Sequence, residues 1–179
     1  MRRPFVLACC VFCLSSPAHA QTFKRLEISG AYAFLNDPQS ETEFHAGWMV
    51  GTAVTLTEWL SAVGEAGGNY ATVEGFASDT RLSVHAVMAG ARAFARIGRL
   101  TEFLQVVAGT TRASGSRFGV TEAHSAFALQ PGVGLDYPLR PHLSARAQLD
   151  RRFIRSRPDG NDAGHQIRFV AALVYRTQN

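Results

Sequence analysis

The chain has 179 residues, a length that suits one domain, and a formal net charge of +4. All its cysteines (Cys9, Cys10 and Cys13) lie in the segment 1–20, so a chain cleaved after that segment has no disulfide, thiolate metal site or cysteine nucleophile. Loss of Arg2 and Arg3 leaves 16 basic and 14 acidic side chains, a net charge of +2 that gives no reason to expect a nucleic-acid partner.

The segment 1–20 has the pattern of an export signal. Arg2 and Arg3 form a basic start, an apolar stretch follows over 5–14, and 18–20 reads Ala-His-Ala, a small-x-small cleavage site. The apolar stretch is too short to cross a bilayer as a helix. The residues 6–9 resemble a lipoprotein cleavage box, but almost no apolar residues precede it. We therefore expect a signal peptide over 1–20 and one domain over 21–179.

Beyond this segment, apolar and polar residues alternate with a period of two. The clearest case is 165–176, because Ile167, Phe169 and Tyr175 alternate with Gln166 and Arg168. Successive side chains of a strand point to opposite faces, so one face is apolar and the other is charged. This pattern predicts eight strands, near 25–35, 44–56, 59–72, 83–96, 101–113, 124–137, 142–154 and 165–176.

The predicted connections alternate between short turns and longer polar loops. Short turns are expected at 56–59, 96–101 and 137–142, and longer loops at 36–43, 73–82, 114–123 and 155–164. This layout is typical of bacterial up-and-down barrels, and no segment after residue 20 has the ~18 consecutive apolar residues of a transmembrane helix. Together with the export signal, it predicts an all-β fold, an eight-stranded antiparallel up-and-down transmembrane β-barrel in the outer membrane.

Alternation also assigns the two faces of the predicted barrel. In the segment 124–137, Phe127 and Leu129 would face lipid, while Gln130 and Asp136 would point into the lumen. Arg151 interrupts the lipid face of the segment 142–154. We expect it near the outer interface, where a long side chain can reach water.

The predicted inward positions carry both signs of charge. Isolated buried ions are very costly, so charges in a narrow lumen must pair with one another. Neighbouring strands allow pairs such as Glu27 with Arg168 across the closing seam, and Glu65 with Arg92 across the third and fourth strands. The favoured interpretation is a structural ion network that fills the lumen, and a catalytic acid–base pair or an ion path is the alternative. The candidate network consists of Glu27, Glu65, Arg92, Asp136, Arg146, Asp150, Arg152 and Arg168.

The chain resembles the eight-stranded outer-membrane β-barrel family of the OmpA-transmembrane and opacity-protein type. The resemblance covers nearly all of the chain after residue 20. It implies a barrel in the outer membrane, reached by export through the inner membrane, and a C-terminal strand that the barrel-assembly machinery reads during biogenesis. It rests on the segments 47–51 (Gly-Trp-Met-Val-Gly), 59–60 with 64–65, 90–92, 132–136 (Gly-Val-Gly-Leu-Asp) and 169–175 (Phe-Val-Ala-Ala-Leu-Val-Tyr).

These features favour a non-enzymatic barrel of structural or surface-interaction type, with a largely filled lumen and not a general porin. Its expected partners are outer-membrane lipids and lipopolysaccharide, and we expect a monomer with no nucleic-acid partner, cofactor or metal site. Arginine suits bidentate contact with phosphate, so the arginines near the outer rim are candidates for contact with lipopolysaccharide phosphates. These are Arg112, Arg117, Arg155 and Arg157.

Three alternatives stay open at this point. His124 beside Ser125 suggests a lipid-modifying enzyme, although adjacent strand residues face opposite sides and cannot readily act as base and nucleophile. Small inward residues could leave a narrow channel, at Gly47, Gly51, Gly90 and Gly134. A soluble periplasmic ligand-binding barrel would show the same alternation.

Overall fold

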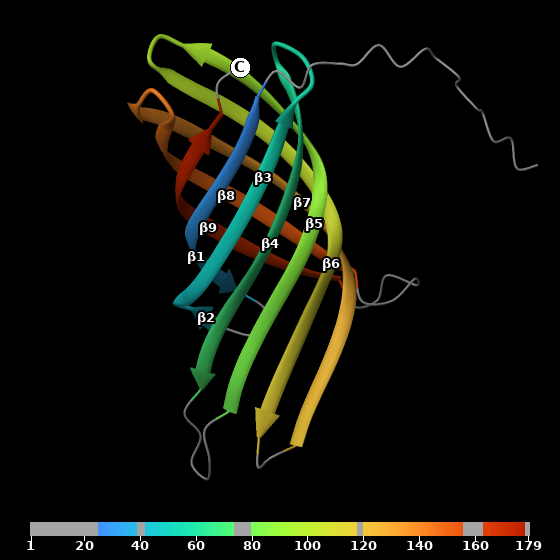
Figure 1. The fold of residues 1–179 in the computed structure, drawn as a ribbon. Coiled ribbons are helices and arrows are strands. Elements are labelled where there is room, and N and C mark those ends of the chain that lie inside the picture. Colours follow the sequence, from blue (N-terminus) through green and yellow to red (C-terminus); the bar gives the residue numbers. More distant parts are fainter. Residues whose placement is uncertain (1–24, 39–41, 74–79, 118–119, 156–162, 178–179) are drawn as a thin grey trace, which may run out of the picture.

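The computed structural model describes residues 25–38, 42–73, 80–117, 120–155 and 163–177, and the expected signal peptide lies outside them. In this part of the chain the regular elements are all strands, and no helix is long and apolar enough to cross a membrane. Figure 1 shows the strands β1 Leu26–Asp37, β2 Thr42–Phe44, β3 Ala46–Thr55, β4 Leu60–Val73, β5 Thr80–Ile97, β6 Leu100–Arg117, β7 Val120–Arg140, β8 Leu143–Arg155 and β9 Ala163–Arg176.

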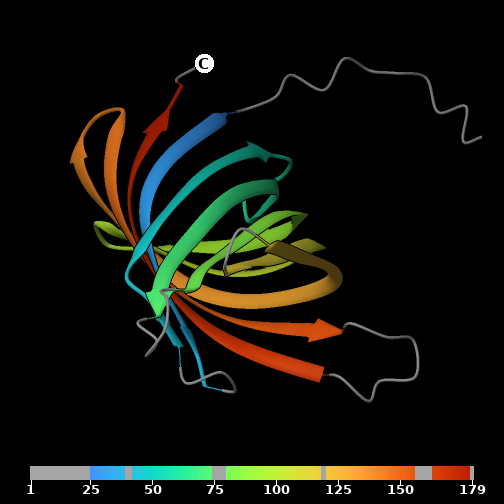
Figure 2. The ribbon, with the colours of Figure 1, turned by 90° about the horizontal axis from the view of Figure 1, so that it is seen from below.

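The strands close into a barrel in which each one pairs antiparallel with its neighbour in sequence. Strands β2 and β3 both pair with β1, and their register differs by one residue on either side of His45. They are therefore two parts of one barrel strand, and the barrel has eight, as the alternation predicts. The seam runs from Glu27 opposite Arg176 to Asn36 opposite Ile167. Figure 2 shows β9, β1, β3 and β4 following one another around one side.

The period-2 pattern separates two faces on each strand. Along β8, the even-numbered residues from Ser144 to Arg152 are buried and point into the lumen. The outer face exposes large apolar side chains such as Val87, Leu104 and Leu173. In water such a surface would be unfavourable, whereas in a bilayer it contacts acyl chains.

The two ends of the barrel differ in how far the strands extend and in how they are joined. At one end the strands join in tight turns, and Gly98 between β5 and β6 has a φ of 60°, a left-handed conformation that glycine adopts without steric cost. At the other end β5, β6 and β7 extend well past β1, β8 and β9 (Figure 1). The last β7–β8 pair is Phe127 with Arg155, but β6 and β7 stay paired as far as Arg117 with Val120.

The prediction of a longer loop at 114–123 is therefore wrong. Ser114 and Gly115 have the composition of a turn, but both lie in the ladder, opposite Ala123 and Glu122. A hairpin needs turn chemistry only at its tip, and polar residues are well accommodated in strands that leave the membrane. We call residues 80–86, 111–117 and 120–126 the projecting sheet.

Apolar side chains fill part of the lumen beside the charged ones. One group lies along β3 to β8 and includes Val63, Met88 and Val107. Another consists of Leu35, Phe44 and Val84, from the strand ends opposite the tight turns. The charged side chains occupy other inward positions at overlapping levels of the barrel, and Arg168 of β9, for example, lies opposite Leu35 of the second group.

Candidate functional site: the charged lumen

The central cluster of the lumen is built around Arg168 of β9. Its Nη2 lies 2.6 Å from Oε2 of Glu65 and 2.7 Å from Oδ2 of Asp150. Two amides complete the cluster, because Gln105 donates to Oε1 of Glu65 at 2.8 Å and Gln148 donates to Asp150 at 3.0 Å. All five side chains are buried, so each charge is matched by partners from other strands.

A second group, the turn-end cluster, lies toward the tight turns. Glu27 accepts from Nη1 of Arg92 at 2.7 Å, from Nη2 of Arg146 at 2.7 Å and from Nε of Arg176 at 3.0 Å. Asp136 pairs with Arg146 through Nε and Oδ1 at 2.7 Å, and also with Arg176. Three guanidinium groups therefore share two carboxylates.

Gln105 joins these two clusters. Its Oε1 accepts from Nε and Nη2 of Arg92 at 3.1 and 2.9 Å, while its Nε2 donates to Glu65. Toward the other end, Arg152 donates to Gln130 at 2.9 Å and to Gln166 at 3.4 Å. The central and turn-end clusters thus form one connected hydrogen-bond network, and the bonds of such a network polarise and strengthen one another in a low-dielectric interior.

An aromatic ring supports the turn-end cluster. The guanidinium carbon of Arg92 lies 4.5 Å from the centroid of the Phe103 ring, and that of Arg146 lies 4.8 Å from it. Two cations thus stack against one buried aromatic side chain. The ring occupies space that Gly134 leaves, because a Cβ at that position would overlap its edge.

Neither of the two candidate pairs forms a direct salt bridge among the described residues. Glu27 lies opposite Arg176 on the seam, whereas Arg168 lies opposite Leu35, so Glu27 and Arg168 are far apart along the barrel. Glu65 lies opposite Met88 and reaches Arg92 only through Gln105. Strand order was sufficient to predict which strands are neighbours, but a pair also depends on the register. Sequence reasoning missed Arg176 as well, although it occupies an inward position of the last alternating segment.

The glycines expected to leave a channel leave little open space. At Gly51 an added Cβ would lie 2.6 Å from Oγ of Ser29, and at Gly47 it would overlap Asn69. At Gly90 and Gly134 an added Cβ would lie within 2.8 Å of the backbone of a neighbouring strand. Neighbouring groups therefore use the room that these positions provide.

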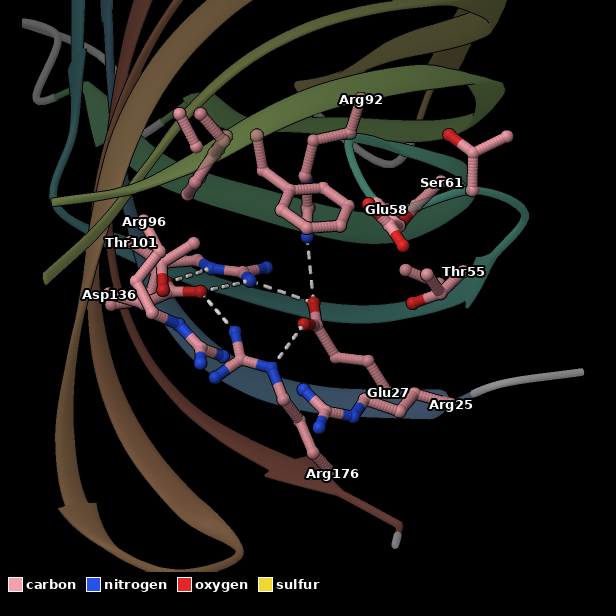
Figure 3. A pocket seen from close by; sticks show the side chains of 16 residues that line it. Arg25, Glu27, Thr55, Glu58, Ser61, Arg92, Arg96, Thr101, Asp136 and Arg176 are labelled. Atoms are coloured by element: carbon pink, nitrogen blue, oxygen red, sulfur yellow. Dashed lines mark hydrogen bonds and ion pairs between the residues drawn. The ribbon is translucent and has the colours of Figure 1, made fainter. Parts of the chain in front are cut away.

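The lumen is hollow at the tight-turn end. A cavity of about 770 Å³ opens there, with the turn-end cluster at its inner end and Thr57 and Glu58 of the β3–β4 turn at its mouth. Figure 3 shows Glu27 between Arg92 and Arg176, with Arg25 beside it. We call this cavity the vestibule.

The candidate rim arginines that the structure describes lie on two different strands. Arg112 and Arg155 are exposed on β6 and β8. Arg117 ends β6, and Arg157 lies outside the described residues. His124 and Ser125 are consecutive residues of β7, opposite Ala113 and Arg112. No group of three or more possible metal ligands occurs in the part of the chain that the structure describes.

Comparison with known proteins identifies the family. A family model described as "Outer membrane protein beta-barrel domain" matches residues 6–176. The chain belongs to this outer-membrane β-barrel family. Among curated proteins, no sequence matches the chain.

Solved structures of outer-membrane barrels have the same fold. Neisserial surface protein A has a TM-score of 0.67 at 12% identity, over 84% of this chain and 95% of that one. The attachment invasion locus protein Ail of Yersinia pestis has a TM-score of 0.60 at 18% identity, over 86% and 99%. The N-terminal barrel domain of Pseudomonas aeruginosa OprF has a TM-score of 0.53 at 12% identity, over 85% and 98%.

One further Ail structure, with a TM-score of 0.57 and 18% identity, over 86% of this chain and 97% of that one, was determined in complex with the heparin analogue sucrose octasulfate. At these identities the similarity shows the fold, and with the family match it places the chain in the outer membrane. Barrels of this family have short periplasmic turns and longer extracellular connections. The vestibule thus opens toward the periplasm, and the projecting sheet rises from the outer surface.

Proposed function

We propose that this chain is a rigid surface-contact barrel, whose lumen network holds the wall in shape while the projecting sheet meets extracellular material. The observation that carries the proposal is the continuation of β5, β6 and β7 past the closed barrel, as far as Arg81 opposite Ser116 and Arg117 opposite Val120. A sheet held in register by the barrel beneath it is a firm platform for contact.

The lumen supports this proposal because its charged side chains bond to one another across the barrel. Arg168 joins β9 to β4 and β8, and Gln105 joins β6 to β4 and β5. Cross-links between strands that are not neighbours resist flattening of the barrel. A transported solute would have to break several charge-assisted hydrogen bonds in turn, each stronger than a neutral one.

The outer surface favours a polyanionic contact. Arg81 and Arg112 are exposed on the projecting sheet, and Arg155 is exposed at the end of β8. Guanidinium groups bind sulfate and phosphate through paired hydrogen bonds. Ail, a barrel of the same fold, was crystallised with a sulfated heparin analogue. We infer contact with sulfated or phosphorylated sugars, including the phosphates of neighbouring lipopolysaccharide.

Two variants, each with a two-residue turn in place of a longer connection, test the role of the projecting sheet. In the first, Asn-Gly replaces residues 115–122, which preserves the Ser114–Ala123 pair and supplies a two-residue hairpin turn. In the control, Asn-Gly replaces 156–162 between the paired Arg155 and Ala163. We expect the first variant to lose retention on immobilised heparin and the control to keep it. Equal retention by both variants and the unaltered protein would refute the proposal.

The contact with lipopolysaccharide has a separate test. Cells that produce the double variant Arg112→Gln and Arg155→Gln should be more sensitive to polymyxin than cells with the unaltered barrel. Arg151→Gln is the matched control, since it removes a charge from the same face of β8. Unchanged sensitivity in the double variant would argue against this contact. Retention on heparin would then be the remaining test of the projecting sheet.

The proposal includes a monomer without enzymatic activity, delivered by the barrel-assembly machinery. The seam between β1 and β9 pairs the edges of the sheet with each other, so no partner chain is needed to close it. His124 and Ser125 lie next to each other on one strand, an arrangement that directs a base and a nucleophile to opposite faces.

A further inference from the structure

The vestibule carries more positive charge than its own carboxylates can balance. In the turn-end cluster Arg92, Arg146 and Arg176 share only Glu27 and Asp136, which leaves one positive charge in excess. Arg92 and Arg146 are 6% and 4% exposed. An unbalanced charge in so enclosed a place is costly, and an anion would offset that cost.

The mouth of the vestibule adds to this excess. Arg25 and Arg96 line it, and neither belongs to an ion pair among the described residues; Glu58 is the acidic side chain there. A second cavity at the same end shares Arg25, Arg96 and Arg176 and is also lined by Arg99 and Arg140. Like charges around a concave, low-dielectric opening focus the field and concentrate counter-ions.

The remaining walls suit an organic ligand. Ser61 and Thr101 offer hydroxyl groups, whereas Phe94 and Phe103 form an apolar side. The volume of about 770 Å³ lies within the usual range of small-molecule sites. Each guanidinium has five N–H donors, and the contacts of Arg176 use its Nε and one hydrogen bond from each Nη, so donors remain for a ligand.

We propose that the vestibule is a periplasm-facing site for a small organic anion with carboxylate or phosphate groups. The anion enters between the β3–β4 turn and Arg96, and its charged groups meet Arg25, Arg96 and the excess positive charge of the turn-end cluster. The central cluster closes the inner end, so the site binds and does not conduct. This site lies at the opposite end from the surface contact proposed above and does not depend on it.

Titration calorimetry of the refolded barrel in phosphatidylcholine nanodiscs tests the site, with citrate and pyrophosphate as probes. We expect binding of at least one probe. The double variant Arg25→Gln and Arg96→Gln should weaken it about tenfold at low salt. Arg151→Glu makes the same change in net charge on the outer face of the barrel and should leave it unchanged. Thr55→Trp fills the vestibule without a charge change and should abolish binding.

Nanodiscs that also contain phosphatidylglycerol distinguish the source of the anion. Competition by this lipid would support the site and assign it to a phospholipid headgroup, whereas undiminished probe binding would support the site and assign it to a free solute. Heat-modifiability on a gel confirms that each variant is folded. Absence of probe binding to the unaltered barrel in phosphatidylcholine would overturn the proposal, as would equal weakening by Arg151→Glu and by the double variant, or unchanged binding by Thr55→Trp.

Discussion

Arg168 and Glu65 form an ion pair across the lumen, with Nη2 of the arginine 2.6 Å from Oε2 of the glutamate, although their strands are not neighbours. The same guanidinium holds Asp150 on β8. One side chain therefore ties three strands together at the middle of the barrel, in an interior where an unpaired charge is strongly unfavourable.

Removal of one partner of this pair should cost more than removal of both. We expect Arg168→Met to lower the free energy of unfolding by about 3–5 kcal/mol, because it leaves Glu65 and Asp150 without their cation. The double variant Arg168→Met and Glu65→Gln should recover part of this loss. Urea unfolding in micelles measures both, with Arg112→Met as an exposed control. Additive losses would show that the two residues are not coupled.

The unaltered barrel should show no stable conductance steps in planar bilayers, because the central cluster blocks the path beyond the vestibule. The triple variant Glu65→Ala, Gln105→Ala and Arg168→Ala removes the block without a net change of charge, and we expect it to conduct. A control with Arg81→Ala and Glu102→Ala also keeps the net charge and should stay closed. Equal conductance in all three proteins would contradict a filled lumen.

Two glycine substitutions should differ in their effect on the free energy of unfolding. Gly134→Val places side-chain atoms where the Phe103 ring lies, and overpacking of this kind costs about 1–3 kcal/mol. At Gly30 an added Cβ meets nothing within 4 Å, so Gly30→Val should be neutral or slightly stabilising. Comparison of the two urea midpoints checks this expectation. A loss at Gly30 as large as that at Gly134 would show that the ring does not depend on the missing side chain.

Arg151 provides a measure of depth in the membrane. It is exposed on the outer face, with its guanidinium 5.1 Å from the Phe153 ring centroid, four residues before the end of β8. We expect Arg151→Leu to change stability by no more than about 1 kcal/mol, as for a cation near an interface, whereas Val133→Arg should cost ~2–4 kcal/mol nearer the midplane. Unfolding in lipid vesicles measures both. A large gain from Arg151→Leu would place the arginine deep in the bilayer.

The fold could be predicted from the sequence because inward-facing and outward-facing side chains alternate along every strand of a barrel. Lumen and lipid alternate along β8 and β9, so the eight strands and their order followed from the pattern, and the structure and family match confirm them. Loop length was harder to predict. The polar residues of 114–117 read as a loop, but hydrogen bonds to β7 keep them in a strand.

The contacts within the lumen could not be predicted to the same extent. Glu27 meets Arg176 and not Arg168 because the register along the seam, which the alternation leaves open by any even number of residues, decides the pair. Gln105, which joins the two clusters, is uncharged, so a search for pairs of opposite charge does not find it. The vestibule depends on how far each strand extends toward the turns, and the pattern sets those ends only approximately.

The seam has a consequence for the lifetime of the folded barrel. Glu27 and Arg176 meet across it although 149 positions separate them in the chain, so this contact forms only after nearly all of the sequence is available. Such distant pairing makes closure slow. By the same reasoning no strand within the membrane can be released singly, since both of its sides are paired. Once closed, the barrel should persist by virtue of a high barrier to opening, whatever its equilibrium stability.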